Sequence, residues 1–422
     1  MATATYNVTT IANVNKIWRK VQTAVQQGAE FMSEEWENLE KLRKFDVDWS
    51  AREITVPLDI NQELGVASIP EGGFEARPSS VNVEELSLTW ILMNARFTVS
   101  KTAKWIDQRN RNAMIERQMR FQAKKKLQAI GRRFGEYFYG FSTGILCDTS
   151  TNATQTNGIY TLLDAYGLAG LGPAGNNFNV TNFFEVGDYV ALIDSGSLVA
   201  NAIGVITAIT PGTPSITVTW NGSVDADAGD NVVFANSLEN TTIAGTDYNA
   251  ALVGLLDMAT STSVHGLSKS SIPAWDVGYS SAAGGRFSGI KLRLMKQGIK
   301  NNGGGKLNTV IWSNGVENDV VASQQAALRF SDPFAMELDG AAKSRGIKFM
   351  TSRKVPNGYV FGYDKKSVRK LSLIDKPSDT PPWEDGDKLE DKSGFVFSMD
   401  FPLATVILNR GNFSFLSGLT EQ

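Results

Sequence analysis

Histidine and cysteine are almost missing from this chain of 422 residues, which contains only His265 and Cys147. A zinc site of the common kind needs several Cys or His ligands, and a Ser or Cys nucleophile normally needs a neighbouring His as its base. Neither site can be assembled from one residue of each type. We therefore predict no metal site, no cofactor and no catalytic residue, and we expect the chain not to be an enzyme.

Long apolar runs are also missing, because Asn, Arg, Asp or Gly interrupts each of them after a few residues. No stretch could therefore span a bilayer. The N-terminal MATATYNVTT also lacks the basic region and the apolar run of a signal peptide. We predict a soluble chain made in a cytoplasm. The single cysteine cannot form an internal disulfide, which fits a reducing compartment.

Two further kinds of chemistry find little support. The glycine-rich NNGGGK at 301–306 lacks the Gly-Lys-Ser/Thr ending of a phosphate-binding loop, so it predicts a turn. A carboxylate-dependent hydrolase stays open as a possibility, although no spacing among the 44 Asp and Glu residues marks out an acid–base pair.

Positive charge is absent from a long central segment. Residues 134–268 contain 12 Asp and Glu but no Lys or Arg, whereas residues 1–133 contain 20 Lys and Arg against 16 acids. Residues 269–422 are again basic, with 21 Lys and Arg against 16 acids. Such segregation indicates a molecule with two differently charged faces.

The N-terminal part changes from helical to strand periodicity. Apolar residues recur every three or four positions over 15–45, which predicts one or two amphipathic helices. A strand with one apolar face follows at 53–61, and a second over 81–92 contains a frame shift at Glu84 and Glu85 that a β-bulge would produce. The Gly- and Pro-rich ASIPEGGFEARPSS between them is typical of a loop tip.

We therefore predict a long hairpin. An isolated hairpin with an apolar face is barely stable in water, so it must pack on another copy or on its own domain's core. Our candidates for contact between subunits are Ile54, Val56, Leu58, Ile60, Gly72, Gly73, Leu86, Leu88 and Trp90.

The segment 104–141 predicts the longest helix, apolar on one face and basic on the other. Between Lys101 and Arg133 there are 11 Lys and Arg against Asp107 and Glu116. Such a helix attracts polyanions without reading their sequence, although a solvated basic face is the plainer interpretation. The candidate DNA-facing residues are Arg109, Arg117, Arg120, Lys124, Lys125, Lys126, Arg132 and Arg133.

Short strands separated by Gly, Pro and Asn fill residues 178–237 and predict a small barrel or sandwich inserted into a larger domain. Mixed α/β sequence returns over 241–352, with a helix at KLRLMKQGIK and a buried strand at LNTVIWSN. The last predicted strands are GYVFGY, VRKLSLI and FPLATVILN. The fold class is therefore α+β.

This order of elements, together with HGLSKSSIPAWDVGYSSAAGG at 265–285, resembles the major capsid protein of tailed bacteriophages with the Hong Kong 97-like fold. The resemblance implies an N-terminal arm, an extended loop, a spine helix with peripheral domain, an inserted β-domain, an axial domain and C-terminal strands. The corresponding residues are 1–45, 46–103, 104–177, 178–240, 241–352 and 353–422.

The same resemblance implies a function and partners. Hexamers and pentamers of the chain would form an icosahedral virion shell around double-stranded DNA, assembled in the host cytoplasm with a portal and, in some cases, a decoration protein. Residues 45–100 contain no lysine, so we predict no covalent cross-link through the extended loop. No long acidic segment precedes the hairpin, which implies a separate scaffolding protein.

The sequence is also compatible with two different functions. An encapsulin-like compartment would use the same fold around protein cargo, without a basic interior. A binding protein that is not part of a shell would use the 178–237 unit as its active β-module.

Overall fold

The computed structural model describes residues 35, 38–42, 48–49, 54–59, 83–88, 90–100, 113–151, 153–168, 180–194, 197–235, 252–282, 284–327, 343–344, 346–372, 387–388 and 394–420. Most of the predicted N-terminal helices and the hairpin tip, with Ile60, Gly72 and Gly73, lie outside these residues, as does Arg109. The chain divides into two units. The first contains residues 1–39, 90–135 and 370–404, and the second contains 40–89, 136–369 and 405–422.

The first unit contains a ribbon of long antiparallel strands and most of a long helix. Strand β5 (Ile91–Ser100) pairs with β21 (Gly394–Ile407) in unbroken register, and β20 (Asp387–Lys388) also pairs with β21. Buried Ile91, Met93 and Ala95 alternate along β5 with exposed side chains, as expected for a strand with one packed face.

Helix α4 (Ala113–Tyr139) confirms the prediction of the longest helix. Its buried residues recur every three or four positions, so one face of the helix packs inward. These residues are Met119, Ala123, Leu127, Ile130 and Phe134.

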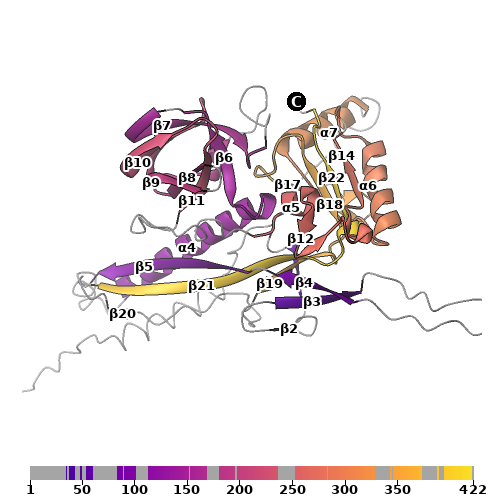
Figure 1. Ribbon diagram of the computed structural model, residues 1–422, viewed down its shortest axis with the longest axis horizontal. Helices are drawn as coiled ribbons and strands as arrows, with labels where there is room; N and C mark the ends of the chain where they lie inside the picture. Colours follow the sequence, from indigo (N-terminus) through magenta and orange to yellow (C-terminus); the bar gives the residue numbers. More distant parts are fainter. Residues whose placement is uncertain are drawn as a thin grey trace, which may run out of the picture. The chain divides into compact units, whose positions relative to one another are not determined.

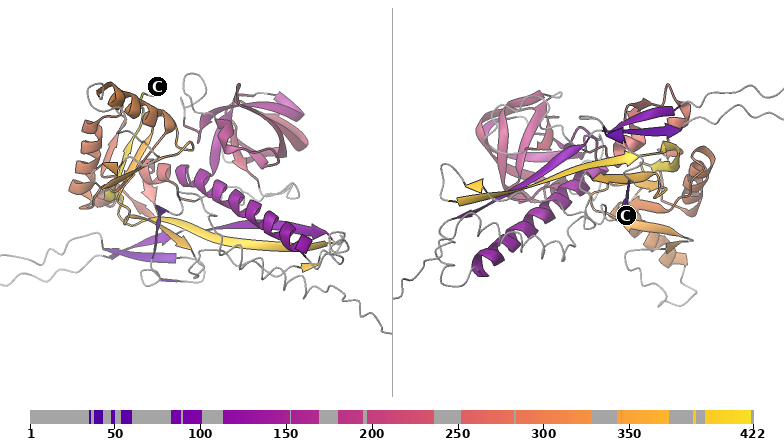
Figure 2. Two further views of the ribbon diagram at one scale, coloured as in Figure 1. Left: turned by 180° about the vertical axis from the view of Figure 1, so that it is seen from behind. Right: turned by 90° about the horizontal axis from the view of Figure 1, so that it is seen from below.

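A closed six-stranded barrel follows α4 and can be traced in Figures 1 and 2. Its strands are β6 (Ile145–Thr149), β7 (Ala153–Ala165), β8 (Tyr189–Asp194), β9 (Ser197–Thr210), β10 (Ser215–Ala226) and β11 (Asn231–Phe234). The predicted β-unit is therefore a barrel, but it begins before residue 178. Strands β6 and β7 were not predicted, because their sequences lack a strict apolar–polar alternation. The short 3-10 helix η2 (Val180–Phe183) precedes β8.

The packing of the barrel includes an apolar cluster and a polar contact between aromatic rings. Ala191, Ile193, Ile203 and Val233 form a buried cluster. Trp220 Nε1 donates a hydrogen bond of 2.7 Å to the Tyr160 hydroxyl, and the two rings meet edge to face at 5.4 Å. A buried indole N–H and phenol thus partner each other, which avoids the cost of leaving either unpaired.

The second unit also contains a six-stranded mixed sheet, ordered β14-β22-β18-β15-β17-β16. These strands are β14 (Tyr279–Ser281), β22 (Phe413–Leu416), β18 (Val360–Tyr363), β15 (Thr309–Trp312), β17 (Ile347–Thr351) and β16 (Lys343–Ser344). Helix α6 (Gly289–Asn302) confirms the helix predicted at KLRLMKQGIK, and helix α7 (Asn314–Ala327) follows the buried strand β15.

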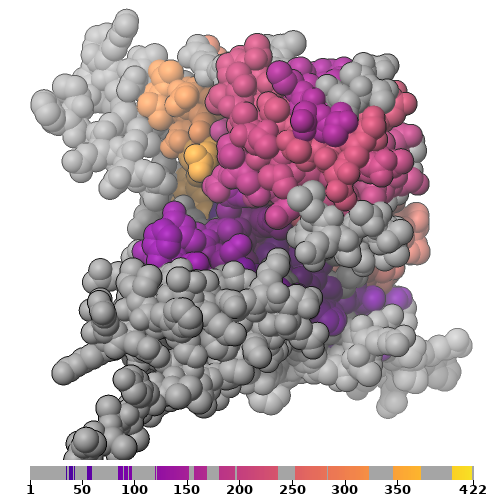
Figure 3. All heavy atoms as spheres, turned by 90° about the vertical axis from the view of Figure 1, so that its left-hand side faces the viewer, coloured from indigo at the N-terminus to yellow at the C-terminus, as the bar shows by residue number. Residues whose placement is uncertain are grey.

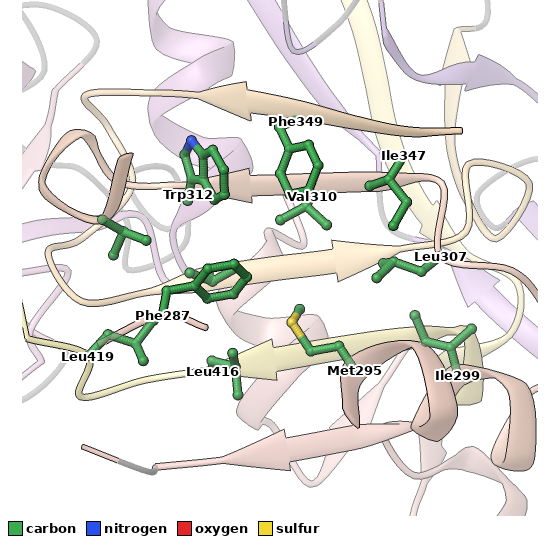
Figure 4. Close-up of a cluster of buried hydrophobic side chains, with 12 residues drawn as sticks. Phe287, Met295, Ile299, Leu307, Val310, Trp312, Ile347, Phe349, Leu416 and Leu419 are labelled. Carbon is green, nitrogen blue, oxygen red and sulfur yellow. The ribbon is translucent and has the colours of Figure 1, made fainter. Parts of the chain in front are cut away.

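One face of this sheet packs against α6. Met295 and Ile299 point from α6 toward Val310, Phe349 and Leu416 on the strands (Figure 4). Each of these five side chains is at most 5% exposed, so α6 is held by a dense apolar layer.

Polar contacts fix the C-terminal end of α6. Asn302 Nδ2 donates to the Gly278 carbonyl at 2.7 Å, and Asn412 Oδ1 accepts from the Gly305 amide at 2.8 Å. Asn412 belongs to the 3-10 helix η4 (Arg410–Asn412), whose buried Arg410 donates to the Met258 and Ser261 carbonyls. These carbonyls lie at the C-terminal end of the short helix α5 (Leu255–Thr260), where a cation interacts favourably with the helix dipole.

The described part of the predicted hairpin is a three-stranded sheet of β2 (Asp48–Trp49), β3 (Ile54–Asp59) and β4 (Val83–Leu88). The register runs without a shift from Ile54–Leu88 to Asp59–Val83, so the predicted bulge at Glu84 and Glu85 is wrong. The strand predicted over 81–92 also ends at Leu88, because the chain beyond Trp90 pairs with β21 instead.

Short elements complete the second unit. Strands β12 (Ser263–Val264) and β13 (Leu267–Ser268) form a tight hairpin, and the 3-10 helix η3 (Pro273–Trp275) follows them. In the sheet that contains β21, the strand order is β1 (Glu40–Lys41), β19 (Val368–Ser372), β21 and β20. A helix was predicted at Glu40 and Lys41, and pairing within the sheet overrides that local preference.

Candidate assembly and nucleic-acid surfaces

The two scarce reactive residues are both buried. Burial raises the pKa of the Cys147 thiol well above its usual range, and the charge of Asp148 raises it further. Within the part of the chain that the structure describes, no group of three His, Cys, Asp or Glu side chains is placed to hold a metal ion. None of the described helices is long and apolar enough to cross a membrane.

His265 has a structural position at the turn between β12 and β13. Its backbone has a φ of 53°, and its carbonyl accepts a hydrogen bond of 3.0 Å from the Ser87 amide of β4. Its ring Nε2 accepts from the Ile407 amide at 3.3 Å, so the neutral ring carries its proton on Nδ1. Burial lowers the pKa of His265 to about 4. This histidine therefore links β4 of the predicted hairpin to β21.

The hairpin candidates divide into buried and exposed residues. Val56, Leu86 and Leu88 are at most 3% exposed within the chain, and Leu58 is half-buried. Trp90 is 40% exposed but lies outside the hairpin, in the other unit. The base of the hairpin thus packs on its own chain.

The candidates on α4 include an exposed basic patch. Lys124, Lys125 and Lys126 are all exposed, and Phe121 beside them is 63% exposed with the Lys125 Nζ 5.9 Å from its ring centre. Arg132 and Arg133 are half-buried, and Arg117 and Arg120 lie in the same helix. The patch that faces solvent is therefore formed by the three lysines, next to an aromatic ring on which a base could stack.

One end of the barrel is acidic. Asp230, 3% exposed, accepts a hydrogen bond from the Asp227 amide in the turn between β10 and β11. Burial raises the pKa of Asp230, and the charges of Asp194, Asp227 and Asp225 raise it further, although its hydrogen bond with the Asp227 backbone lowers it. These three surrounding carboxylates are exposed. Figure 3 shows part of the outer barrel face, coloured pink, as one continuous surface.

Helix α6 carries a basic groove that was not among the surfaces predicted from the sequence. The groove has a volume of about 680 Å³ and lies between α6 and β17. It is lined by Gly289, Leu292, Arg293, Lys296, Gln297, Lys300 and Ile347. A signal is present in the sequence, because positions 293, 296 and 300 share a helix face and the helix contains no acid. The longer and denser basic run of α4 is the more conspicuous of the two.

Solved structures from phages and a particle are similar to this chain at low sequence identity. One is a chain of the cyanophage A-1(L) capsid asymmetric unit, with 12% identity and a TM-score of 0.47 over 91% of this chain and 94% of that chain. A chain of Gordonia phage Cozz has 9% identity and a TM-score of 0.45 over 92% and 86%. A chain of the virus-like particle from Pyrococcus furiosus has 8% identity and a TM-score of 0.38 over 96% and 98%. Neither a protein-family model nor a curated protein matches the sequence.

Proposed function

We propose that this chain is a major capsid protein, a non-catalytic subunit that assembles with copies of itself into the icosahedral shell of a tailed bacteriophage. The observation that carries the proposal is the chain order of the described elements. The paired strands β3 and β4 come first, then the 27-residue helix α4, the closed barrel, and the six-stranded sheet packed against α6. The resemblance noted in the sequence implies this order for extended loop, spine helix, inserted domain and axial domain.

Within this function, the elements have distinct roles. The hairpin base is anchored by the Ser87–His265 hydrogen bond, so residues 60–82, which join β3 to β4, are the part that reaches a neighbouring subunit. The shell is built of hexamers and pentamers, since closed shells repeat near-equivalent interfaces. A separate scaffolding protein and a portal take part in assembly in the host cytoplasm.

The contents of the shell follow from the α4 patch. Lys124, Lys125 and Lys126 are exposed on one helix and can neutralise phosphates without reading bases. We therefore propose packaged double-stranded DNA, held without sequence preference, as the main interior partner. A compartment for protein cargo has no need of such a patch.

Electron microscopy of the purified full chain, with and without scaffolding protein, tests the proposal. We expect closed particles or capsomers, and a chain that stays monomeric under all assembly conditions would refute it. Replacing Lys124, Lys125 and Lys126 with Gln should weaken salt-sensitive association with duplex DNA, whereas the same change at exposed Lys306, Lys365 and Lys366 should weaken it less. Equal effects of the two triple variants would indicate that the basic face of α4 is only solvated and does not bind DNA.

A further inference from the structure

Helix α6 has a charge pattern that its own stability does not explain. Its 14 residues include Lys291, Arg293, Lys296 and Lys300 but no Asp or Glu. The helix dipole favours acids in the first turn and bases in the last, so only Lys300 is placed as a stable helix prefers. Lys291 donates to the Gly284 and Gly285 carbonyls just before the helix, whereas Arg293 and Lys296 point to a role outside the helix.

Three of these cations form one rim of the groove described above. Arg293, Lys296 and Lys300 are exposed, and none of them forms an ion pair in the described structure. Since α6 rises about 1.5 Å per residue, the three charges are spread over about 10 Å of the helix. Leu292 and Ile347 supply an apolar floor. Beside the rim, Ile290 is 73% exposed and Leu294 is 38% exposed.

A groove with an apolar floor and a cationic rim fits an acidic protein surface better than a bare phosphate backbone, because both parts of it become buried. The chain itself carries such a surface in the acidic end of the barrel. Asp194, Asp225 and Asp227 are exposed there, their negative charges act on buried Asp230, and no base occurs anywhere in residues 134–268. Cations brought to this end would offset these negative charges.

We propose that the α6 groove of one copy binds the acidic end of the barrel of a second copy. This inference rests on the proposed self-assembly and names one of its contacts. Asp225 lies at the end of β10 and Asp227 just after it, so these exposed residues are two positions apart, with their Cα atoms at most about 7 Å apart. Lys296 and Lys300 are separated by about 6 Å along α6, a span that two lysines can match with both carboxylates. The contact repeats head to tail, as interfaces between unlike surfaces do in rings.

Charge reversal in the full chain tests the contact. A groove variant carries Arg293→Glu, Lys296→Glu and Lys300→Glu, and a barrel variant carries Asp194→Lys, Asp225→Lys and Asp227→Lys. A control variant, Lys306→Glu, Arg353→Glu and Lys366→Glu, reverses three exposed cations outside the groove and changes the net charge as the groove variant does. Sedimentation velocity at low and high salt measures association, and thermal unfolding checks that each variant folds.

We expect each of the first two variants to associate at least about tenfold more weakly, because each reverses three charges at the contact. Combining both sets of substitutions in one chain should restore association to within about threefold, because the reversed surfaces again match. An equimolar mixture of the two variants should also associate better than either alone. Restoration excludes misfolding as the cause of the single-variant losses.

The opposing results are equally distinct. Failure of the combined variant to recover, or equal loss in the control, would overturn the contact while leaving assembly of the natural chain intact. Loss of binding to a short DNA duplex in the groove variant, with association unchanged, would assign the groove to nucleic acid instead. A natural chain that never associates would refute the proposed function together with this contact.

Discussion

Acid should destabilise the fold through one residue, His265. Its pKa is about 4 in the folded chain, against an ordinary value of 6.5, because burial disfavours the charged ring. Above pH 6.5 the ring is neutral in both folded and unfolded states and contributes no pH dependence. As the pH falls below 6.5 the unfolded state binds a proton that the folded state still excludes, so the free energy of unfolding decreases.

The size of the effect follows from the two pKa values. A difference of one pKa unit corresponds to about 1.4 kcal/mol, so the free energy of unfolding should fall by about 3 kcal/mol between pH 7 and pH 4. The geometry gives the same sign, because a protonated Nε2 could no longer accept the Ile407 amide hydrogen. The turn would then lose its bond to β21 and loosen the carbonyl that holds Ser87.

Urea unfolding of the natural chain and of His265→Gln, at four pH values from 7 to 4, isolates this residue. The substitution has a constant cost from the strained backbone, but Gln does not titrate. The difference in free energy of unfolding between the two chains should therefore shrink by about 3 kcal/mol as the pH falls. Parallel curves for the two chains across the whole range would refute the reasoning, whatever the pH dependence of either one.

Three further outcomes are expected. Gly254→Ala should lower the free energy of unfolding by about 3 kcal/mol, because the new Cβ would overlap the Gly140 carbonyl oxygen; Gly212→Ala, with open space around it, is the control. Burial and the charge of Asp164 raise the pKa of Asp148 to about 6, so the stability that the folded state gains by holding this proton is lost as the pH rises from 4 to 6. Asp148→Asn should abolish this pH dependence, which amounts to about 1 kcal/mol for a half-buried group. Urea titrations measure it, and an unchanged profile would contradict the prediction. Cys147 should react with a thiol reagent at pH 8 only after urea unfolds the barrel, and rapid labelling of the native chain would show that its burial is incomplete.

The sequence was informative where periodicity and burial coincide. The α4 stripe from Met119 to Phe134 and the all-buried strand β15 were predicted from spacing alone, because their cores lie within single elements. The predicted bulge at Glu84 and Glu85 was wrong for the opposite reason. What looked like one strand with a frame shift is two strands with different partners, and the choice of partner depends on β21, far away in the chain.

The candidate surfaces were predictable only in part. The three exposed lysines of α4 follow from helical spacing, but nothing local showed that Val56, Leu86 and Leu88 would be buried by their own chain. Burial is a property of tertiary packing, whereas exposure of a charged run is the default for its residue type. The acidic end of the barrel was visible only as a charge count, because Asp194 and the residues of 225–230 lie in separate parts of the sequence.

The start of the barrel shows how the chain accommodates this domain. Strand β6, the first of the barrel, pairs with β11, the last, so the chain enters and leaves through neighbouring strands. Just outside them, Gly254 approaches the carbonyls of Gly140 and Tyr137 with no room for a side chain, and the Ser142 amide donates to Asp257. The barrel is therefore closed at its neck by backbone contact. A domain joined in this way can have an acidic surface without disturbing the packing between α6 and the sheet. A segment without Lys or Arg can therefore lie between two basic segments of the chain.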